Sequence, residues 1–420
     1  MALAKAIVLK DLEESEKKNK VVSGDEIRAV VTHYLQNLNS SAAETFEADA
    51  DLFIREILSA KGDNVQVDSK SVKQELKKIE LVCSDIPFPP PAKPKFTFID
   101  LFAGIGGFRM AMQELGGKCV FSSEWDEKAK VTYLTNYGEV PFGDITSDKI
   151  KSYIPQKFDL LCAGFPCQAF SIAGKRAGFE DTRGTLFFDV AQIIKKHQPK
   201  VVFLENVKGL FSHDKGNTLK VILNTLREDL GYFVPNPEIK NAKHYGVPQN
   251  RERVFIVGFH PDLKVGDFAY PDSKEISVVL EDILEKEVVE TKYYLSDQYL
   301  STLKLHKQRH AGKGNGFGYE VIANDGISNA IVVGGMGRER NLVFDERITD
   351  FNPTTKIRGE VNREGIRKMT PREWSRLQGF KDEFLIPVAD ASAYKQFGNS
   401  VAVPAIRATG ENLLKKAGLI

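Results

Sequence analysis

Residues 96–115 are FTFIDLFAGIGGFRMAMQEL, and this stretch decides the fold class that we expect. Its apolar start, residues 96–102, predicts a buried strand of a parallel sheet, and residues 109–115 predict a helix. Gly104 and Gly106 lie in the turn between them, where glycine permits close approach of the backbone to a ligand. This arrangement is common in nucleotide-like ligand sites of α/β proteins, although it is not the G-x-G-x-x-G of dinucleotide binding. We therefore predict an α/β fold.

Two further elements follow at the spacing of strand–helix units. Residues 118–122 predict a strand that ends at Glu124 and Trp125, and a third element ends at Asp144 and Ile145. An acidic side chain at the end of the second strand is placed to bind ribose hydroxyls, and the Trp125 ring offers a face to an adenine. Such carboxylates are often only solvated. The alternative is that they bind a nucleoside ligand, which their recurrence at successive strand ends favours.

The next expected strand, residues 158–163, runs into the loop GFPCQAFS, residues 164–171. Pro166 restricts the backbone there, so Cys167 is presented by a stiff turn. Open α/β sheets bind ligands at the carboxyl ends of their strands, where a thiolate can act as a nucleophile. A lone cysteine more often serves as a small apolar residue, and this loop by itself leaves both interpretations open.

Two polar clusters accompany the remaining strands. Residues 200–204 predict a buried strand that delivers Glu205 to the same edge, where a carboxyl group can hydrogen-bond or protonate a substrate ring. A helix cap or a surface acid is the alternative for Glu205. Arg251 and Arg253 precede a strand over residues 254–259, and their spacing points both side chains the same way. Such a pair suits an acceptor oxygen or a phosphate.

The N-terminal region predicts helices separated by polar breaks. Residues 23–34 have the pattern of a capped amphipathic helix, and residues 48–59 and 69–81 predict two more. We expect a helical extension over residues 1–92 without chemistry of its own, and DNA contact or partner binding is the alternative. The extension ends in a proline-rich linker, residues 86–94, which is the clearest domain boundary of the chain.

Composition narrows the class of protein. The 42% apolar and 27% charged residues are typical of a soluble globular protein, and no signal peptide or long uncharged apolar run is evident. The cysteines form no C-x-x-C pair, so we expect neither a metal site nor disulfides, and a reducing cytoplasm fits best. The net charge of +1 hides an asymmetry, because residues 301–380 hold 14 Lys and Arg against 9 Asp and Glu. A local phosphate-binding surface would need such an excess.

Eight short motifs occur in an order that resembles a known family. They are FIDLFAGIGGF (98–108), EW (124–125), GDI (143–145), GFPCQAFS (164–171), ENV (205–207), QNRERVF (249–255), MTPREWSRLQGF (369–380) and YKQFGNSV (394–401). Together they resemble the DNA cytosine-5-methyltransferases of bacterial restriction-modification systems, over about residues 96–260 and 366–410. The resemblance implies a Rossmann-like domain that depends on S-adenosyl-methionine, a smaller target-recognition domain that is mainly β or irregular, and a flipped-out target base.

The resemblance also implies roles for individual residues. Cys167 matches the attacking thiolate, Glu205 matches the carboxyl group that bonds the base, and Arg251 and Arg253 match the pair near the thiolate. The residues that match the cofactor site are Phe102, Gly104, Gly106, Glu124, Trp125, Asp144, Ile145, Pro166, Leu186, Asn399 and Ser400. The last two are included because the family folds its final motif back beside its first. No metal is implied.

The family pattern divides the chain after its N-terminal extension. It implies a catalytic and cofactor-binding domain over residues 93–261, a target-recognition domain over 262–365, and a C-terminal segment, 366–420, that returns to the catalytic domain. Glycine-rich turns in the recognition segment carry basic side chains, and the candidates for DNA recognition are Arg309, Lys313, Arg338 and Arg340. Arginine favours guanine edges, although each turn alone is equally consistent with a solvated loop.

We therefore expect a sequence-specific DNA cytosine-5-methyltransferase that uses S-adenosyl-methionine. Its expected partner is double-stranded DNA with a short, GC-rich, palindromic site. A cognate restriction endonuclease would act on the same site without a stable complex, and the enzyme would work as a monomer. A tRNA methyltransferase on the same scaffold is one alternative. An inactive DNA-binding homologue is another, and the presence of Cys167, Glu205 and Arg253 argues against it.

Overall fold

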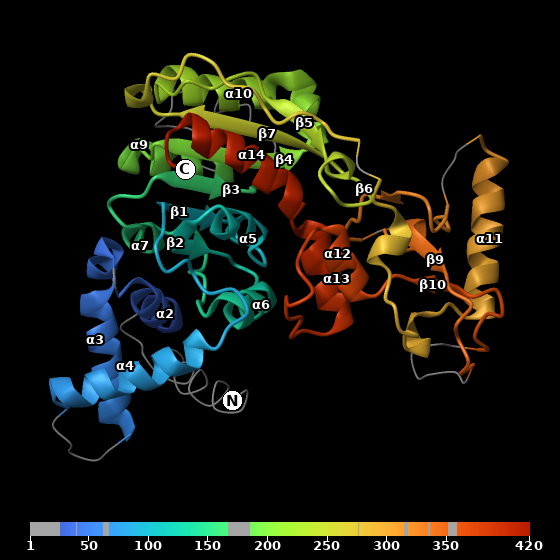
Figure 1. Cartoon of the computed structure of the whole chain (residues 1–420), viewed down its shortest axis with the longest axis horizontal. Coiled ribbons are helices and arrows are strands. Elements are labelled where there is room, and N and C mark those ends of the chain that lie inside the picture. Colours follow the sequence, from blue (N-terminus) through green and yellow to red (C-terminus); the bar gives the residue numbers. More distant parts are fainter. Residues whose placement is uncertain are drawn as a thin grey trace. The chain divides into compact units, whose positions relative to one another are not determined.

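The computed structural model describes residues 26–38, 40–61, 67–166, 185–275, 277–314, 318–334, 337–351 and 359–420 (Figure 1). These residues form two compact units, and each unit combines separate stretches of the chain. The first unit comprises the described parts of Met1–Ile239, Val254–Pro271 and Thr409–Ile420, and the second those of Lys240–Arg253 and Asp272–Ala408. The chain therefore passes between the two units several times.

A six-stranded sheet lies at the centre of the first unit, with strand order β2-β1-β3-β4-β7-β5. Its strands are β1 Phe96–Leu101, β2 Gly117–Ser123, β3 Leu160–Ala163, β4 Val201–Val207, β5 Glu238–Asn241 and β7 Glu252–Phe259. β1 pairs in parallel with β2 and β3, and β3 pairs in parallel with β4. Parallel strands alternating with helices confirm the predicted α/β fold.

The strand register brings the carboxyl ends of the parallel strands to one edge of the sheet. Leu101, the last residue of β1, pairs with Ser123 of β2 and with Ala163 of β3. Ala163 in turn pairs with Leu204 of β4. The segments that follow these four positions therefore begin side by side, as ligand-binding loops of open α/β sheets do.

Helices of the first unit pack around the sheet (Figure 1). α5 (Gly107–Glu114) directs Phe108 against Phe203 of β4, with the ring centroids 5.2 Å apart in an edge arrangement. α6 (Glu127–Tyr137) begins after Asp126, whose side chain accepts hydrogen bonds from two backbone N–H groups of the first turn. The other helices are α7 Asp148–Ser152, α9 Leu186–His197, α10 Asn217–Asn224 and α14 Val403–Lys416, which continues from the second unit.

In the described part of the chain, three α-helices precede the sheet, as the sequence predicts. They are α2 Ile27–Asn37, α3 Glu47–Lys61 and α4 Ser69–Ser84, and α2 lies beside β2 (Figure 1). Val30 and Phe46 of this region belong to the same buried apolar cluster as Phe121 and Phe142. The N-terminal helices therefore share one hydrophobic core with the sheet. The cap expected at residues 23–25 lies outside the described residues.

The second unit consists of helices, very short strands and irregular segments. Its helices are α11 Asp297–Ala311, α12 Pro371–Leu377 and α13 Asp390–Asn399, and its strands are β6 Gln249–Asn250, β8 Ser328–Asn329, β9 Leu342–Phe344 and β10 Ile366–Lys368. Arg367 is fully buried and donates hydrogen bonds to Asp345 and to Glu373 at 2.8–2.9 Å. A buried arginine shared by two carboxylates fixes the position of β10 against its neighbours.

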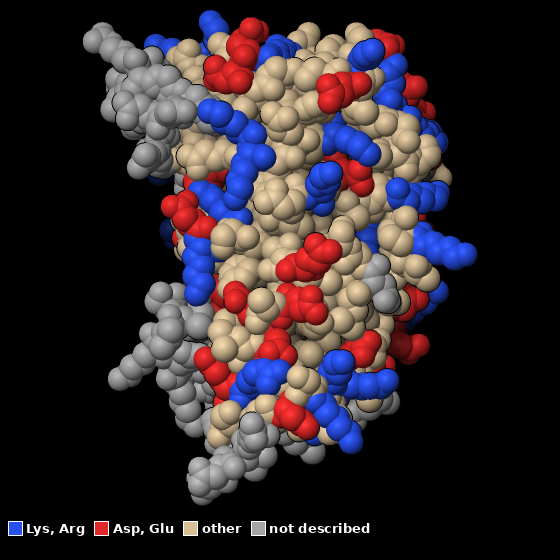
Figure 2. Space-filling view, turned by 90° about the vertical axis from the view of Figure 1, so that its left-hand side faces the viewer, with Lys and Arg blue, Asp and Glu red and all other residues tan. Residues whose placement is uncertain are grey.

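Single-turn helices complete the described chain, at Ser41–Thr45, Lys208–Phe211, His213–Gly216, Thr225–Asp229, Ala242–His244, Pro261–Leu263, Leu280–Ile283, Thr291–Tyr293 and Glu339–Asn341. No helix in the described ranges has the length and apolar character needed to cross a bilayer. On the face of the molecule drawn in Figure 2, Lys, Arg, Asp and Glu side chains are interspersed among other residues. A mixture of both signs is typical of an ordinary solvated face.

Candidate active site

The glycine-rich turn after β1 adopts backbone conformations that few residues tolerate. Phe102, Gly104 and Gly106 have φ angles of 56°, 57° and 85°. A side chain at Gly106 would collide with the Tyr137 ring, since its Cβ would lie 2.3 Å from Cε2. A Cβ at Gly104 would meet no described atom within 4 Å, so this side of the turn is open. Positive φ at Phe102 costs on the order of 1 kcal/mol, and such outliers cluster at functional sites.

Glu124 connects the end of β2 to this turn. Its side chain is 8% exposed and accepts hydrogen bonds from the backbone N–H groups of Gly104 and Asp126, each at 2.8 Å. Burial raises the pKa of Glu124, and the two backbone hydrogen bonds oppose that effect. Each carboxylate oxygen retains a second lone pair, so Glu124 can still accept from hydroxyl groups.

Trp125 and the segment 142–145 flank Glu124. The Trp125 side chain is 81% exposed and presents its ring to solvent. The backbone of Phe142 pairs with Ser122 and with Glu124 at the end of β2, through hydrogen bonds of 2.9 and 2.7 Å. Asp144 is therefore held near Glu124 with its side chain exposed, whereas the side chain of Ile145 is buried.

The loop after β3 is tied to the end of β4. Phe165 is buried and Pro166 is exposed, while Cys167 lies outside the described residues. Asn206 is 2% exposed and its Nδ2 donates a hydrogen bond of 2.8 Å to the Phe165 carbonyl oxygen. Glu205, the preceding residue of β4, is 8% exposed. The chain leading to Cys167 is thus held beside the strand that carries Glu205.

Leu186 is the first residue of α9, and its side chain is partly buried. It follows the segment 167–184, which is not among the described residues. The expected contact of Leu186 with a cofactor therefore stays a prediction.

The remaining predicted site residues lie in the second unit. The Arg251 guanidinium is 2% exposed and donates to the backbone carbonyl oxygens of Ile331, Gly398 and Ser400, at 2.8, 3.2 and 2.6 Å. The acceptor oxygens of this arginine thus include protein carbonyls. Through them Arg251 holds the segment 398–400 in place. Arg253 is partly exposed and donates to the carbonyl oxygen of Glu252.

Asn399 and Ser400 end α13 and differ in accessibility. Asn399 is exposed, whereas Ser400 is 8% exposed and its carbonyl oxygen also accepts a hydrogen bond from Gln378. Together with Arg251, this contact fixes the backbone of the motif that contains both residues.

The candidates for DNA recognition all carry exposed side chains. Arg309 and Lys313 lie at the end of α11, and Arg338 and Arg340 flank a single-turn helix. The Arg338 guanidinium lies 5.5 Å from the centre of the Tyr394 ring. Among the described residues, none of these four side chains forms an ion pair, in contrast to the buried Arg367. Their charges are therefore available to a polyanion.

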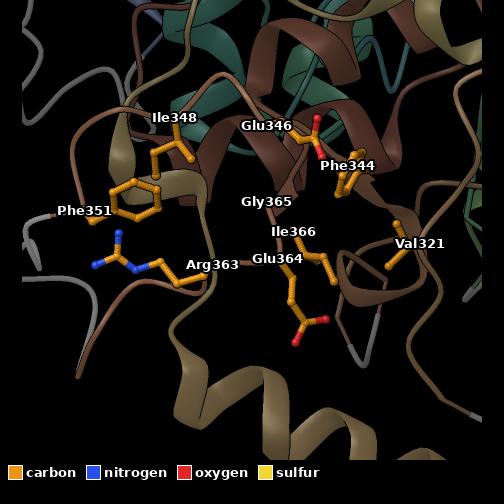
Figure 3. Close-up of a pocket in the computed structure, with 9 residues that line it drawn as sticks. All are labelled: Val321, Phe344, Glu346, Ile348, Phe351, Arg363, Glu364, Gly365 and Ile366. Atoms are coloured by element: carbon orange, nitrogen blue, oxygen red, sulfur yellow. The ribbon is translucent and has the colours of Figure 1, made fainter.

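A pocket of about 600 Å³ lies elsewhere in the second unit (Figure 3). It is lined by Val321, Phe344, Glu346, Ile348, Phe351, Arg363, Glu364, Gly365 and Ile366. Arg363 lies over the Phe351 ring at 3.8 Å. Glu346 and Glu364 supply the carboxylates among the lining residues, and Glu364 forms an ion pair with Lys304. These carboxylates disfavour a phosphate, and no predicted site residue lines the pocket.

Sequence reasoning does not single out two buried charges near the glycine-rich turn. Asp100 of β1 is fully buried, and burial raises its pKa well above the usual value. Arg109 of α5 is also fully buried and donates to Glu139 at 2.7 Å and to the Tyr133 hydroxyl at 3.1 Å. The sequence carries a signal for both residues, because charged side chains are rare in protein cores. The signal is an Asp within an apolar strand and an Arg within an apolar helix.

Comparison with known proteins gives consistent matches. A family model described as C-5 cytosine-specific DNA methylase matches residues 96–415. Type II methyltransferase M.HpaII of Haemophilus parainfluenzae is 72% identical over 329 residues, which are 78% of this chain and 92% of that protein. Type II methyltransferase M.DsaV of Dactylococcopsis salina is 46% identical over 325 residues, which are 77% of this chain and 87% of the relative.

Solved structures support the same fold. The Dnmt2 methyltransferase of S. pombe has a TM-score of 0.56 at 16% identity, covering 76% of this chain and 98% of that one. The methyltransferase EhMeth of Entamoeba histolytica has a TM-score of 0.57 at 19% identity, with coverage of 76% and 98%. With the family match over residues 96–415 and the identity to the type II enzymes, the chain belongs to the C-5 cytosine-specific DNA methylase family.

Proposed function

We propose that this chain methylates C5 of a cytosine within one short site of duplex DNA, with Cys167 as the attacking nucleophile. The hydrogen bond between Asn206 and the Phe165 carbonyl oxygen supports this proposal most directly. It ties the chain leading to Cys167 to the strand that bears Glu205. A nucleophile and a carboxyl group on neighbouring strand ends can act on the same base.

The proposed nucleophile makes the cytosine ring reactive. The Cys167 thiolate forms a bond to C6 while the C5–C6 double bond opens, and C5 becomes an enamine-like carbon that can take a methyl group. Loss of the C5 proton and of the sulfur–C6 bond then restores the double bond and the thiolate. Glu205 would bond N3 and the exocyclic amine and stabilise the activated ring. This covalent route replaces one difficult step by easier ones.

The two arginines would serve the nucleophile in different ways. Arg253, which is partly exposed, would lie near the thiolate and the O2 oxygen of the base, and its charge favours the thiolate form. Arg251 already donates to the backbone carbonyl oxygens of Gly398 and Ser400. We assign it mainly to holding that motif in place.

The edge beside β1 and β2 suits S-adenosyl-methionine, which supplies the methyl group when bound. The open side of Gly104 leaves room for the ligand, and the buried Glu124 carboxylate can accept from ribose hydroxyls. The exposed Trp125 ring and the apolar Ile145 suit an adenine. The other residues proposed to hold the cofactor are Phe102, Gly106, Asp144, Pro166, Leu186, Asn399 and Ser400.

We assign DNA recognition to residues 262–365 and catalysis to residues 93–261 together with 366–420. The target base must leave the duplex to reach Cys167. The pocket that receives this base contacts only the cytosine itself, so it accepts a cytosine from any site. Neighbouring bases are left for the recognition segment, where Arg309, Lys313, Arg338 and Arg340 are exposed. We expect the extension, residues 1–92, to lack chemistry of its own.

The proposed target site is the one that M.HpaII modifies. A continuous match of 329 residues in a chain of 420 cannot begin after residue 92 or end before residue 329. It therefore includes most of the recognition segment, and the identity over the whole match is 72%. We expect a short, GC-rich, palindromic site, a monomeric enzyme in the bacterial cytoplasm, and a cognate restriction endonuclease that acts on the same site without a stable complex.

Two assays test this function. S-adenosyl-methionine with a tritiated methyl group should label duplex DNA and not tRNA when the purified protein is added. Bisulfite sequencing of plasmid from expressing cells should find one modified cytosine in one short site, the same as in cells that express M.HpaII. Label in tRNA alone would favour the tRNA enzyme. DNA binding without label would favour an inactive homologue.

A further inference from the structure

Glu26, the N-cap residue of helix α2, reaches the proposed cofactor site and lies outside the region of the family match. The Glu26 carboxylate accepts hydrogen bonds from the backbone N–H of Gly143 at 3.1 and 3.2 Å. A Cβ at Gly143 would lie 2.6 Å from Glu26 Oε1, so the close approach favours glycine there. Asp144, a proposed cofactor residue, follows directly. Glu26 is only 7% exposed.

His33 makes a second contact, to the strand that carries Glu124. Its ring is fully buried and its Nδ1 lies 2.8 Å from the Ala29 carbonyl oxygen, which can only accept. Nδ1 is therefore the donor, and Nε2 accepts from the backbone N–H of Ser122 at 3.1 Å. Ser122 precedes Glu124 by two residues. The His33 ring also packs against Phe142, with ring centroids 4.6 Å apart.

The linker makes a third contact. The Phe88 ring lies 5.9 Å from the Tyr137 ring, centroid to centroid. The Tyr137 hydroxyl donates a hydrogen bond of 2.8 Å to the carbonyl oxygen of Gly106, within the glycine-rich turn. The N-terminal region thus reaches all three segments that carry the proposed cofactor residues of β1, β2 and the loop at 142–145.

We propose that helix α2 and its N-cap residue Glu26 support the cofactor site, and that Glu26 is a positioning residue for Asp144. This inference rests on the proposed function, because it takes the edge beside β1 and β2 to bind S-adenosyl-methionine. Glu26 holds the backbone at Gly143 and thereby sets the approach of Asp144 and Ile145 to the ligand. His33 holds β2 from the same helix and supports Glu124. The extension therefore tunes cofactor affinity through the backbone that it holds in place.

The test uses the whole chain of 420 residues with substitutions at Glu26. Glu26→Ala removes the acceptor for the Gly143 N–H, whereas Glu26→Gln keeps one oxygen acceptor and removes the charge. Glu26→Asp keeps the charge on a side chain that is one methylene shorter. Glu44→Ala is the matched control, because Glu44 belongs to the same extension and its side chain is exposed. Cofactor KM, kcat on duplex DNA, calorimetric binding of S-adenosyl-homocysteine and the ligand-free melting temperature are measured for each protein.

We expect Glu26→Ala to raise the cofactor KM and Kd by about two- to tenfold, which corresponds to the loss of one such hydrogen bond. At saturating cofactor, kcat and DNA affinity should stay near those of Glu44→Ala. Glu26→Gln should recover most of the affinity, and Glu26→Asp should recover little because it cannot reach Gly143. This split between KM and kcat, with rescue by Gln, would not arise from a general loss of stability.

Other outcomes overturn the inference. Unchanged cofactor affinity in Glu26→Ala would do so, as would equal losses in kcat, DNA affinity and cofactor affinity. If Glu26→Ala fails to fold, Glu26→Asp and Glu26→Gln still decide the question through their opposite expectations. Glu124→Ala separates this inference from the proposed function. If Glu124→Ala binds S-adenosyl-homocysteine normally, the site itself is misassigned. If Glu124→Ala loses affinity and Glu26→Ala does not, only the role of α2 is wrong.

Discussion

The Asn206 side chain donates a hydrogen bond of 2.8 Å to the carbonyl oxygen of Phe165, which lies two residues before Cys167. The Asn206 Oδ1 atom accepts from the backbone N–H of Val207 at 2.9 Å, so both ends of the amide are used. This amide therefore joins the end of β4 to the loop after β3. It fixes the start of the segment that carries the proposed nucleophile.

Asn206→Asp should reduce kcat more than it alters substrate binding. The carboxylate has nearly the same shape but cannot donate to the Phe165 carbonyl oxygen, so the loop loses its anchor. A displacement of about 1 Å in a reacting group can cost on the order of 100-fold in rate. Single-turnover methyl transfer at saturating DNA and cofactor measures the effect, and the melting temperature is followed in parallel. A wild-type rate in Asn206→Asp would show that this hydrogen bond is irrelevant to catalysis.

Cys167→Ser should abolish methylation and leave cofactor binding nearly intact. A hydroxyl group at neutral pH is a far poorer nucleophile than a thiolate. Burial raises the pKa values of Cys119 and Cys162 well above their usual value, so these thiols cannot substitute for Cys167. DNA with a fluorine at C5 of the target cytosine should trap the unaltered enzyme covalently. Full activity in Cys167→Ala would refute the mechanism.

Glu124→Ala should weaken S-adenosyl-methionine binding by about 1–3 kcal/mol, the cost of losing hydrogen bonds to a buried carboxylate. The same change leaves the backbone N–H groups of Gly104 and Asp126 without their present acceptor. The glycine-rich turn should therefore loosen as well. Calorimetry measures the cofactor affinity, and DNA affinity should change much less. Equal losses for both ligands would point to a folding defect.

At least one of Arg309→Ala, Arg338→Ala and Arg340→Ala should relax base preference. A bidentate arginine–guanine contact discriminates against the wrong base by about 1–3 kcal/mol. A phosphate contact would instead lower affinity uniformly and reduce the salt slope by roughly one per charge lost. Methylation of a library of single-base site variants distinguishes the two roles.

Transfer of residues 262–365 into a relative that modifies a different site should carry the specificity with it. The catalytic segments on either side must accept any cytosine, so the information about neighbouring bases should reside in this segment. Bisulfite sequencing of DNA from cells that express the chimaera identifies the modified site. An active chimaera that keeps the site of its host would make the N-terminal region the next candidate.

Stability should fall as the pH drops below about 6.5, because His33 is buried in its neutral form. Burial is the main cause that lowers the pKa of His33 from 6.5, and the negative charge of Glu139 partly opposes this. The unfolded chain then binds a proton at a higher pH than the folded chain, so unfolding becomes more favourable from pH 6.5 downward. Urea unfolding at pH 7.5 and 5.5 measures the difference, which His33→Gln should reduce.

Groups facing His33 act in a different pH range. Burial opposes ionisation of Glu139, but the charges of Arg109 and His33 and the hydrogen bonds from Ser122 and Arg109 together outweigh it and lower the pKa of Glu139 below 4.5. Its contribution is therefore present above pH 4.5 and is lost at lower pH. If His33→Gln loses as much stability between pH 7.5 and 5.5 as the unaltered protein, His33 does not cause the change.

The sequence by itself determined the α/β fold, the order of its elements and the family. The pattern of residues 96–115 predicts β1, the glycine-rich turn and α5, and the structure contains each of them. The periodicity of residues 48–59 and 69–81 likewise predicts α3 and α4. These features are local, because apolar spacing and glycine placement act over a few neighbouring residues. The motif order that indicates the family is also contained in the chain itself.

The tertiary structure alone decided which residues, distant in the sequence, form hydrogen bonds with one another. Nothing in the spacing of Glu26 or His33 indicates that they contact Gly143 and Ser122, which lie 117 and 89 residues away. Arg251 likewise donates to a carbonyl oxygen 149 residues distant. A buried donor or acceptor must find a partner wherever packing brings one within about 3 Å. Which partner that is depends on how whole elements dock, and local sequence patterns do not contain that information.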